Sequence, residues 1–145
     1  MVKPYLSVII PVYNNAMDLP LTLIDIDKHL SDQEYSYEII VVNDGSSDAT
    51  SKIAQKFNHL IRNLKLIDNP DNQGIGPIVR VAMATAKGNV RVIMSAQNTT
   101  SITEFNKMMP HFREGADVLV GSNGYDFICF SEEAAQNVFT LTKTD

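Results

Sequence analysis

The amino-acid sequence predicts an α/β fold in which a mainly parallel sheet lies between two layers of helices. Two observations lead to this prediction. Short apolar runs rich in β-branched residues alternate along the chain with segments whose apolar residues recur with the helical period. The runs are also almost continuously apolar, which is typical of strands buried on both faces of a parallel sheet. Strands that alternate with crossover helices give a doubly wound, three-layer α/β/α sandwich.

The apolar runs are the expected strands of this sheet. They cover residues 6–10, 37–42, 64–67, 90–94 and 116–120, and a last strand-like piece covers residues 127–130. All are short, as strands of globular proteins usually are.

The first two helices are expected between these early runs. Apolar residues line one face of the first helix, and they are Leu19, Leu23, Ile26 and Leu30. Ser47 and Asp48 are expected to open the second helix, because their side chains can accept hydrogen bonds from free backbone N–H groups. Ile53 and Phe57 should then point inward.

Three later helices have recognisable boundary signals. Pro77 stands in the expected first turn of the third helix, and Gly88 is expected to end it. Ser101 and Glu104 have the spacing of a capping box at the start of the fourth. Its apolar face would carry Phe105, Met108 and Phe112. Ser131 is positioned to cap a final helix.

Length and charge limit the functional classes. The chain has 145 residues, the size of one domain, so residues 1–145 are expected to form a single unit. The formal net charge is −5, and no cluster of Lys or Arg occurs along the chain. A protein that binds nucleic acid normally carries a basic patch, so nucleic acid is not an expected partner.

Cysteine usage and hydropathy suggest a cellular location. Cys129 is the single cysteine, so no internal disulfide is expected. The amino terminus shows no secretory signal pattern. The longest apolar runs, such as residues 6–12, are far shorter than the ~20 residues of a membrane-spanning helix. A cytoplasmic location without a transmembrane segment is therefore expected.

Ligands of open α/β sheets bind at the carboxyl ends of the strands, where the strand order reverses. The segments that follow the first four expected strands are therefore the candidate site. They are residues 11–15, 43–48, 69–76 and 95–98.

In these segments the chain resembles a family 2 glycosyltransferase of the GT-A fold, a Rossmann-like architecture. Its nearest group is the dolichyl- or polyprenyl-phosphate sugar synthases. The resemblance is carried by "LSVIIPVYNNA", "YEIIVVNDGSSDAT", "NPDNQGIGPIVRVAMATAKGN" and "EGADVLVGS". It covers about residues 5 to 122 and, more weakly, residues 126 to 139.

The resemblance implies a site for a UDP- or GDP-sugar, or for the free nucleotide. The positions that would surround the nucleotide are Pro11, Tyr13, Asn15, Asp44, Ser46, Asn72, Gly74, Gly76 and Arg80. The chemistry of these residues agrees with that role. A Tyr beside a strand end offers a flat surface for a base, and the Asp44 carboxylate can accept a hydrogen bond from a ring N–H. Gly45 permits a sharp turn before a helix N-terminus, which attracts anions.

Each of these motifs also has an ordinary structural interpretation. Asp44 to Ser47 alone is a turn with a helix cap, and Arg80 is as well suited to a structural role as to ligand binding. Gly74 and Gly76 alone hint at a dinucleotide site, but the third glycine of that fingerprint would fall at Val79. A Rossmann NAD site is therefore rejected.

The metal-binding motif of the family is missing. Relatives carry Asp-x-Asp after the fourth strand, where the carboxylates hold Mg²⁺ or Mn²⁺ against the sugar diphosphate. The matching residues here are Ser95, Ala96 and Gln97, which have no carboxylate. Hard divalent cations prefer anionic oxygens, and Gln97 and Asn98 offer only neutral ones. No metal site and no cofactor are expected.

Other positions depart from the family pattern. Asn15, Ile75 and Asn123 stand where relatives often have Glu, Lys and Arg. After about residue 122 the chain passes almost at once to "FICFSEEAAQNVF", which resembles a "GFKxFxxEAAxxxF" segment found much later in relatives. The acceptor-binding region is therefore expected to be deleted, and a partner chain would have to supply it.

The sequence does not identify catalytic residues. The three histidines, His29, His59 and His111, fall in or at the ends of expected helices and suit a solvated surface. A metal clamp supplies several kcal/mol of transition-state stabilisation. Losing ~4 kcal/mol would slow transfer about a thousandfold. The interpretation is a nucleotide-sugar-binding domain with weakened glycosyl transfer. The alternatives are a non-catalytic relative that binds nucleotides or partners, and a truncated α/β scaffold without a ligand.

Overall fold

The computed structural model describes residues 3–121 and 124–140. The strands are β1 (Leu6–Val12), β2 (Tyr37–Asp44), β3 (Leu64–Asn69), β4 (Val90–Met94), β5 (Val118–Gly121) and β6 (Gly124–Ser131). The helices are α1 (Leu19–Ser31), α2 (Thr50–Leu60), α3 (Ile75–Thr85), α4 (Phe105–Arg113) and α5 (Glu132–Val138), and a 3₁₀ turn, η1 (Ile102–Glu104), precedes α4.

The strands form one mixed sheet in the order β3-β2-β1-β4-β6-β5. The first four strands pair in parallel, and β6 pairs antiparallel with both β4 and β5. Five of the six strands therefore run in one direction. The prediction of a mainly parallel, doubly wound sheet is confirmed. The chain winds from β1 outward to β3 and then returns to β4, so the strand order reverses between β1 and β4.

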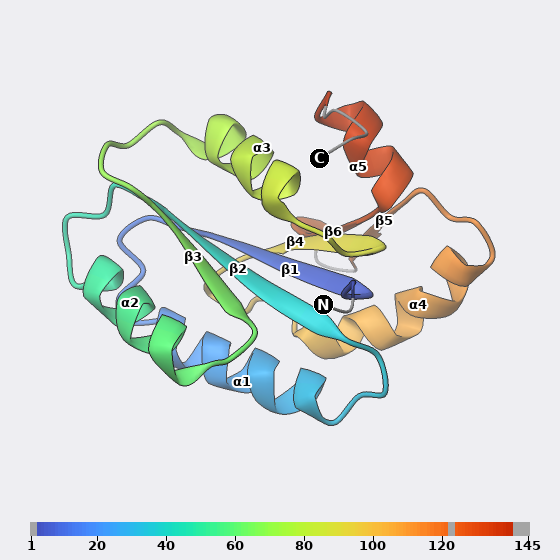
Figure 1. The fold of residues 1–145 in the computed structure, drawn as a ribbon, viewed down its shortest axis with the longest axis horizontal. Helices are drawn as coiled ribbons and strands as arrows, with labels where there is room; N and C mark the ends of the chain where they lie inside the picture. The colour runs from blue at the N-terminus through green and yellow to red at the C-terminus, as the bar shows by residue number, and fades with distance from the viewer. Residues whose placement is uncertain (1–2, 122–123, 141–145) are drawn as a thin grey trace.

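Helices cover both faces of the sheet (Figure 1). On one face, α1, α2 and α4 pack over the larger core, to which Leu23, Ile26 and Phe105 contribute fully buried side chains. On the other face, α3 and α5 cover a smaller core that contains Ile78 and Met83. Because side chains alternate along a strand, each buried strand serves both cores. The near-continuous apolar runs of the sequence follow from this arrangement.

The first two helices agree with the sequence pattern. The four apolar residues expected on the inner face of α1 are all buried. Helix α2 starts at Thr50, two residues after Asp48, whose Oδ1 accepts a hydrogen bond from the Thr50 backbone N–H at 2.9 Å. Ile53 and Phe57 are partly buried and pack against the core, as predicted.

The expected end of α3 at Gly88 is wrong. The helix ends at Thr85, and Gly88 is a buried residue of the connection to β4. A Cβ atom at Gly88 would lie 2.5 Å from Ser7 Oγ and 2.7 Å from Ser7 N. The glycine is therefore needed for close approach to β1 rather than for a helix stop.

Ser101 and Ser131 cap the later helical segments, but the Glu104 half of the predicted capping box is not seen among the described contacts, where this carboxylate pairs with Lys107 at 3.6 Å. Ser101 Oγ accepts a hydrogen bond from Thr103 N and opens η1 ahead of α4. Ser131 Oγ accepts from Ala134 N at the start of α5. In the described part of the chain, no helix is long and apolar enough to cross a membrane.

Candidate functional site

The carboxyl ends of the parallel strands bring the predicted segments to one edge of the sheet. Val12 of β1 is level with Asn43 of β2, and Asp44 is level with Asn69 of β3. A hydrogen bond joins the loop after β1 to the loop after β2: Asn14 N donates to Ser46 Oγ at 3.0 Å. The prediction that Tyr13 and Asp44 lie at the same edge is confirmed. These loops are called the carboxyl-edge loops below.

Two asparagines shape the first of these loops. Asn14 has a left-handed φ of 52°, a conformation that Asn tolerates better than most residues. Its Oδ1 accepts from Ser47 N at 2.8 Å and from Asp48 N at 3.3 Å, so it caps the turn before α2. Asn15 Oδ1 accepts from Tyr13 N at 2.9 Å. The bond from Tyr13 N to Asn15 holds the Tyr13 backbone in place, while the residue remains 49% exposed.

Asp44 has a structural role that sequence reasoning missed. The residue is only 3% exposed. Its Oδ1 accepts from Gln73 N at 2.7 Å and its Oδ2 accepts from Gly74 N at 3.0 Å. The carboxylate therefore fastens the loop after β3 to the end of β2. Because a carboxylate has about four lone-pair sites, these two bonds leave acceptor capacity for a ligand.

The glycine after Asp44 allows this contact. Gly45 has a left-handed φ of 69°. A Cβ atom there would lie 2.6 Å from Asn72 N, so the close approach of the two loops needs a residue without a side chain. Asn72 Nδ2 also donates to the Asp44 carbonyl at 3.3 Å.

Ser46 belongs to a chain of side-chain hydrogen bonds. Its hydroxyl donates to Asn43 Oδ1 at 2.6 Å, and Asn43 Nδ2 donates to Asp68 Oδ1 at 2.7 Å. Asn43 is buried, and sequence reasoning treated it only as part of a motif. The signal that could have identified it is the position of an asparagine directly after five buried residues of β2. This chain joins the ends of β2 and β3.

The remaining predicted nucleotide-binding residues are more dispersed. Pro11 is half-buried in β1, and Gly76 lies in the first turn of α3 with open space around it. Gly74 precedes α3 with a φ of 90°. Arg80 donates to the carbonyls of Phe139 at 3.1 Å and Thr140 at 3.4 Å. Its guanidinium therefore holds the end of α5, which is the structural role that the sequence left open.

The segment after β4 is a tight turn. Ser95 N donates to the Asp126 carbonyl at 3.2 Å, and Gln97 N donates to Ser95 Oγ at 3.1 Å. The Ala96 carbonyl accepts a hydrogen bond from Thr22 Oγ1 at 2.6 Å, which joins this turn to α1. A hollow of about 570 Å³ lies beside Gln97 and is lined by outward-facing residues of α1.

The residues of this turn do not fit a divalent cation of the kind that the family uses. Among the described residues, no group of three or more His, Cys, Asp or Glu side chains is arranged to hold a metal ion. Asn98 Oδ1 is buried without a hydrogen-bond partner in the described structure, but it is a neutral oxygen. The carboxylate of Asp25 accepts from Asn98 Nδ2 at 3.2 Å. One carboxylate and one amide fall short of the anionic oxygen set that Mg²⁺ and Mn²⁺ prefer.

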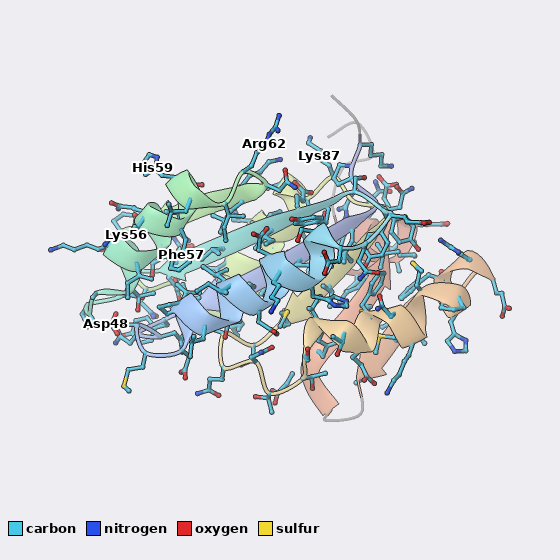
Figure 2. The ribbon with its side chains drawn as sticks, turned by 90° about the horizontal axis from the view of Figure 1, so that it is seen from below. Asp48, Lys56, Phe57, His59, Arg62 and Lys87 are labelled. Atoms are coloured by element: carbon cyan, nitrogen blue, oxygen red, sulfur yellow. The ribbon has the colours of Figure 1, made fainter. Side chains whose placement is uncertain are left out.

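The histidines lie away from the carboxyl-edge loops. His29 belongs to α1, His59 to α2 and His111 to α4. His59 and His111 are exposed, as predicted, whereas His29 is half-buried and its Nε2 lies 3.4 Å from Asn106 Nδ2. Figure 2 shows His59 on the outer surface of the molecule.

Comparison with known proteins identifies relatives of the chain. The family described as Glycosyl transferase family 2 matches residues 7–142. A dolichyl-phosphate beta-glucosyltransferase of Dictyostelium discoideum is 33% identical over 111 residues, which are 72% of this chain and 34% of the relative. Dolichyl-phosphate beta-glucosyltransferase ALG5D of Trichomonas vaginalis is 30% identical over 130 residues, which are 81% of this chain and 39% of the relative. The chain thus spans a little over a third of the length of these relatives.

Solved structures show the same fold. TarS 1-349 of S. aureus in complex with UDP-GlcNAc is 26% identical with a TM-score of 0.62, and the match covers 80% of this chain and 33% of that one. Mannosyltransferase PcManGT of Pyrobaculum calidifontis, in complex with GDP-Man and Mn²⁺, is 18% identical with a TM-score of 0.74. That match covers 95% of this chain and 47% of the other. The predicted GT-A architecture is confirmed.

Proposed function

The chain belongs to glycosyl transferase family 2, and we propose that its carboxyl-edge loops bind the nucleotide of a nucleotide-diphospho-sugar. The observation that carries this proposal is that three loops at one edge of the sheet are joined by hydrogen bonds, and one of them carries an exposed aromatic ring. Tyr13 is half-exposed at the end of β1, and the loops after β1, β2 and β3 are fastened to one another through Ser46 and Asp44. A base stacked on Tyr13 would meet loops that are already in position, which lowers the cost of binding.

UDP is the proposed nucleotide, with GDP as the alternative. The TarS structure that contains UDP-GlcNAc is 26% identical to this chain, whereas the structure that contains GDP-Man is 18% identical. The curated relatives are named as dolichyl-phosphate beta-glucosyltransferases, which favours a glucose donor and a polyprenyl-phosphate acceptor.

The turn after β4 favours a second function, binding without efficient transfer. Ser95 and Gln97 replace the two carboxylates that would clamp a departing diphosphate. Losing ~4 kcal/mol of transition-state stabilisation would slow transfer about a thousandfold. In this proposal the chain either transfers sugar slowly or binds the nucleotide without chemistry.

A calorimetric titration with UDP, GDP, UDP-glucose and GDP-mannose, with and without Mn²⁺, tests the proposal. We expect UDP to bind nearly as well as UDP-glucose, because the missing groups would have contacted the sugar-diphosphate end. We also expect Mn²⁺ to leave the affinity unchanged. Binding of none of the four at millimolar concentration would reject the proposal and favour a scaffold without a ligand. If UDP binds, assays of glucose transfer to a polyprenyl phosphate and of UDP-glucose hydrolysis then separate a slow enzyme from a binding module.

A further inference from the structure

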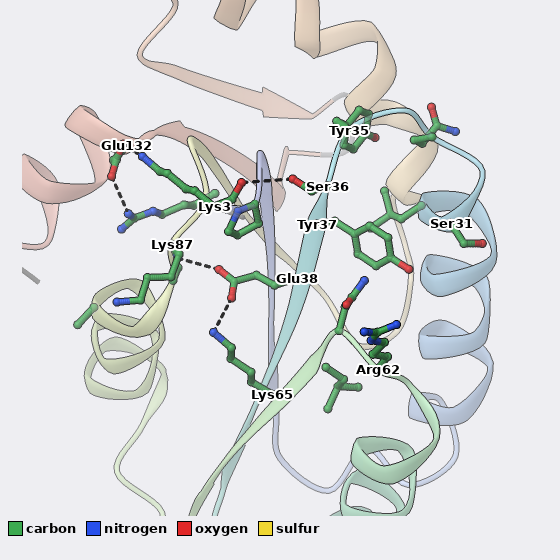
Figure 3. A pocket seen from close by; sticks show the side chains of 18 of the residues that line it. Lys3, Ser31, Tyr35, Ser36, Tyr37, Glu38, Arg62, Lys65, Lys87 and Glu132 are labelled. Atoms are coloured by element: carbon green, nitrogen blue, oxygen red, sulfur yellow. Dashed lines mark hydrogen bonds and ion pairs between the residues drawn. The ribbon is translucent and has the colours of Figure 1, made fainter. Parts of the chain in front are cut away.

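A sizeable cavity lies at the opposite edge of the sheet from the carboxyl-edge loops. It has a volume of about 740 Å³ and is lined by residues at the starts of β2, β3 and β4, with the ends of α1 and α3 and the start of α5 (Figure 3). This volume is within the range of small-molecule sites, roughly 300–1,000 Å³. We call it the amino-edge cavity.

Positive charge is concentrated at this cavity in an otherwise acidic protein. The chain carries a formal net charge of −5. The amino-edge cavity is nevertheless lined by five cationic side chains and only two acidic ones, Glu38 and Glu132. The cationic residues are Lys3, Arg62, Lys65, Lys87 and Arg91. A cavity with this excess of cations attracts anions.

The two acidic side chains are already occupied by protein groups. Glu38 is buried, and its Oε2 accepts from Ser7 Oγ at 2.6 Å and from the backbone N–H of Lys87 at 2.7 Å. Its Oε1 pairs with Lys65 Nζ at 2.9 Å. Figure 3 shows this carboxylate between Lys87 and Lys65.

Glu132 is occupied in the same way at the other side of the cavity. It pairs with Lys3 Nζ at 2.7 Å and lies 3.5 Å from Arg91 Nη2. The Arg91 guanidinium is buried, and it also donates to the carbonyls of Gly88 at 3.1 Å and Met83 at 2.9 Å. Arg91 is therefore a fixed part of the wall. Three of the five cations, Lys3, Lys65 and Arg91, thus have a carboxylate partner in the wall.

Two cations are left without an anionic partner. The side chains of Arg62 and Lys87 make no ion pair with any described residue, although both line the cavity. The hydrogen bond to Glu38 comes from the backbone N–H of Lys87, so the Lys87 ammonium has no carboxylate partner among the described residues. Arg62 follows α2 and Lys87 precedes β4, so the two charges reach the cavity from different elements. Figure 3 shows Glu38 and Lys65 between these two side chains, so an anion in the cavity would meet unpaired positive charge on either side.

The wall of the cavity is partly apolar. Leu30, Leu64 and Ala86 contribute to the lining, together with Tyr35 and Tyr37. The Tyr37 hydroxyl donates to Asp27 Oδ1 at 2.8 Å, which fixes the ring beside the cavity. An occupant therefore needs an apolar or aromatic body as well as an anionic group.

From this combination we infer that the amino-edge cavity binds a small organic anion, a phosphate monoester or carboxylate with an aromatic or aliphatic body. Its anionic group would be attracted by the unpaired charges of Arg62 and Lys87, and its body would lie against the apolar part of the wall, such as Tyr37 and Leu64. This site is separate from the proposed nucleotide site, since it lies at the other edge of the sheet.

The experiment is an NMR titration of the whole chain with phenyl phosphate, phenol and inorganic phosphate. We expect phenyl phosphate to shift the backbone amides of Glu38, Lys65 and Lys87 without shifting those of Tyr13 and Ser46. Phenol and inorganic phosphate should each bind more weakly, because phenol lacks the anionic group and inorganic phosphate lacks the aromatic body. Raising the salt concentration should weaken phenyl phosphate binding, since the two cations are exposed.

Charge-neutral variants identify the residues responsible. Exposed ion pairs contribute little, so Arg62→Gln or Lys87→Gln should each raise the dissociation constant roughly two- to fivefold, and the double variant roughly five- to twentyfold. Lys56→Gln is the matched control, because Lys56 is exposed on α2 and does not line the cavity (Figure 2). The thermal stability of all variants should be unchanged, since neither side chain makes an ion pair in the described structure.

Three results would overturn the inference. The first is the absence of amide shifts at the cavity with phenyl phosphate at about 10 mM. The second is a phenol affinity equal to that of phenyl phosphate. The third is a Lys56→Gln variant that weakens phenyl phosphate binding as much as Arg62→Gln or Lys87→Gln does. None of these depends on UDP binding. Failure of this inference and failure of the proposed nucleotide site therefore remain distinguishable.

Discussion

Replacing Asp44 by asparagine should loosen the carboxyl-edge loops before it affects any ligand. Both carboxylate oxygens accept backbone N–H groups, from Gln73 at 2.7 Å and from Gly74 at 3.0 Å. Asparagine has one acceptor oxygen, so its NH₂ group must face one of these two donors. One charge-assisted hydrogen bond is lost in a site that is only 3% exposed, where water cannot replace it.

The expected cost follows from that single lost bond. A hydrogen bond to a charged group contributes about 1.5–3 kcal/mol, and an unsatisfied buried donor costs a similar amount. For a domain of this length, that loss lowers the melting temperature by about 5–10 °C. The affinity for UDP should also fall roughly ten- to hundredfold, through loss of an acceptor for the base or through loosening of the loop.

Thermal unfolding and amide hydrogen exchange measure these effects. The exchange of the Gln73 and Gly74 amides should accelerate in the Asp44→Asn variant, while amides in the centre of β1 stay protected. Asp71→Asn is the matched control, because Asp71 is exposed in the same loop and its side chain makes no hydrogen bond within the described residues. If the melting temperatures of the two variants agree within about 2 °C and the two amides keep their protection, the assigned role of Asp44 is wrong.

Three further substitutions and one addition have calculable outcomes. Glu38→Gln should lower the free energy of unfolding at neutral pH by about 1.5–3 kcal/mol, because glutamine has one acceptor oxygen for the donors from Ser7, Lys87 and Lys65. Burial tends to raise the pKa of Glu38, but the hydrogen bonds from Ser7, Lys87 and Lys65 bring it below the ordinary value of 4.5. The stabilisation is thus present above pH 4.5 and is lost as the pH falls through the lowered pKa, so acid unfolding curves of the two proteins should converge once the pH is below that lowered pKa. Gly45→Ala should destabilise the domain by at least about 2 kcal/mol, because its φ is 69° and a Cβ atom would lie 2.6 Å from Asn72 N. Gly76→Ala, in a helical turn with open space around it, should instead stabilise by about 0.5–1 kcal/mol, and equal effects of these two substitutions in urea unfolding would contradict the loop geometry. Addition of Mn²⁺ at micromolar concentration should broaden no amide resonance of residues 95–98, and a micromolar site abolished by Gln97→Ala would show that the turn after β4 does bind metal.

Sequence reasoning succeeded for the fold because the signals are local. Buried strands of a parallel sheet need apolar residues on both faces, and the centres of β1 (residues 8–10) and β2 (residues 39–42) show them without interruption. Helix starts with a side-chain cap, such as Ser131, depend on a few neighbouring residues. The position of β6 between β4 and β5 was not predicted, since strand order depends on contacts between residues distant in the chain.

The interpretation of single residues was less complete. A glycine after an apolar helix is the usual signal for a helix stop, which is why the sequence predicts that role for Gly88. In the structure, the residue that leaves no room for a side chain at Gly88 is Ser7, which is distant in the sequence. The sequence predicts that Asp44 binds a ligand. In the structure its carboxylate accepts hydrogen bonds from the backbone N–H groups of Gln73 and Gly74, about 30 residues later in the chain. The amino-edge cavity had no sequence signal, because its charged residues come from β1, β2, β3, β4 and α5 or from the segments before them.

The most direct test of the central claim is an NMR titration of the isotopically labelled chain with UDP. The account predicts saturable shifts of the amides of Tyr13, Ser46 and Gly74, at the carboxyl edge of the sheet. It also predicts that these shifts weaken in Tyr13→Ala and persist in the control Tyr35→Phe, which alters a ring at the opposite edge. Shifts confined to Glu38, Lys65 and Lys87, or no shifts at millimolar UDP, would contradict a nucleotide site in the carboxyl-edge loops.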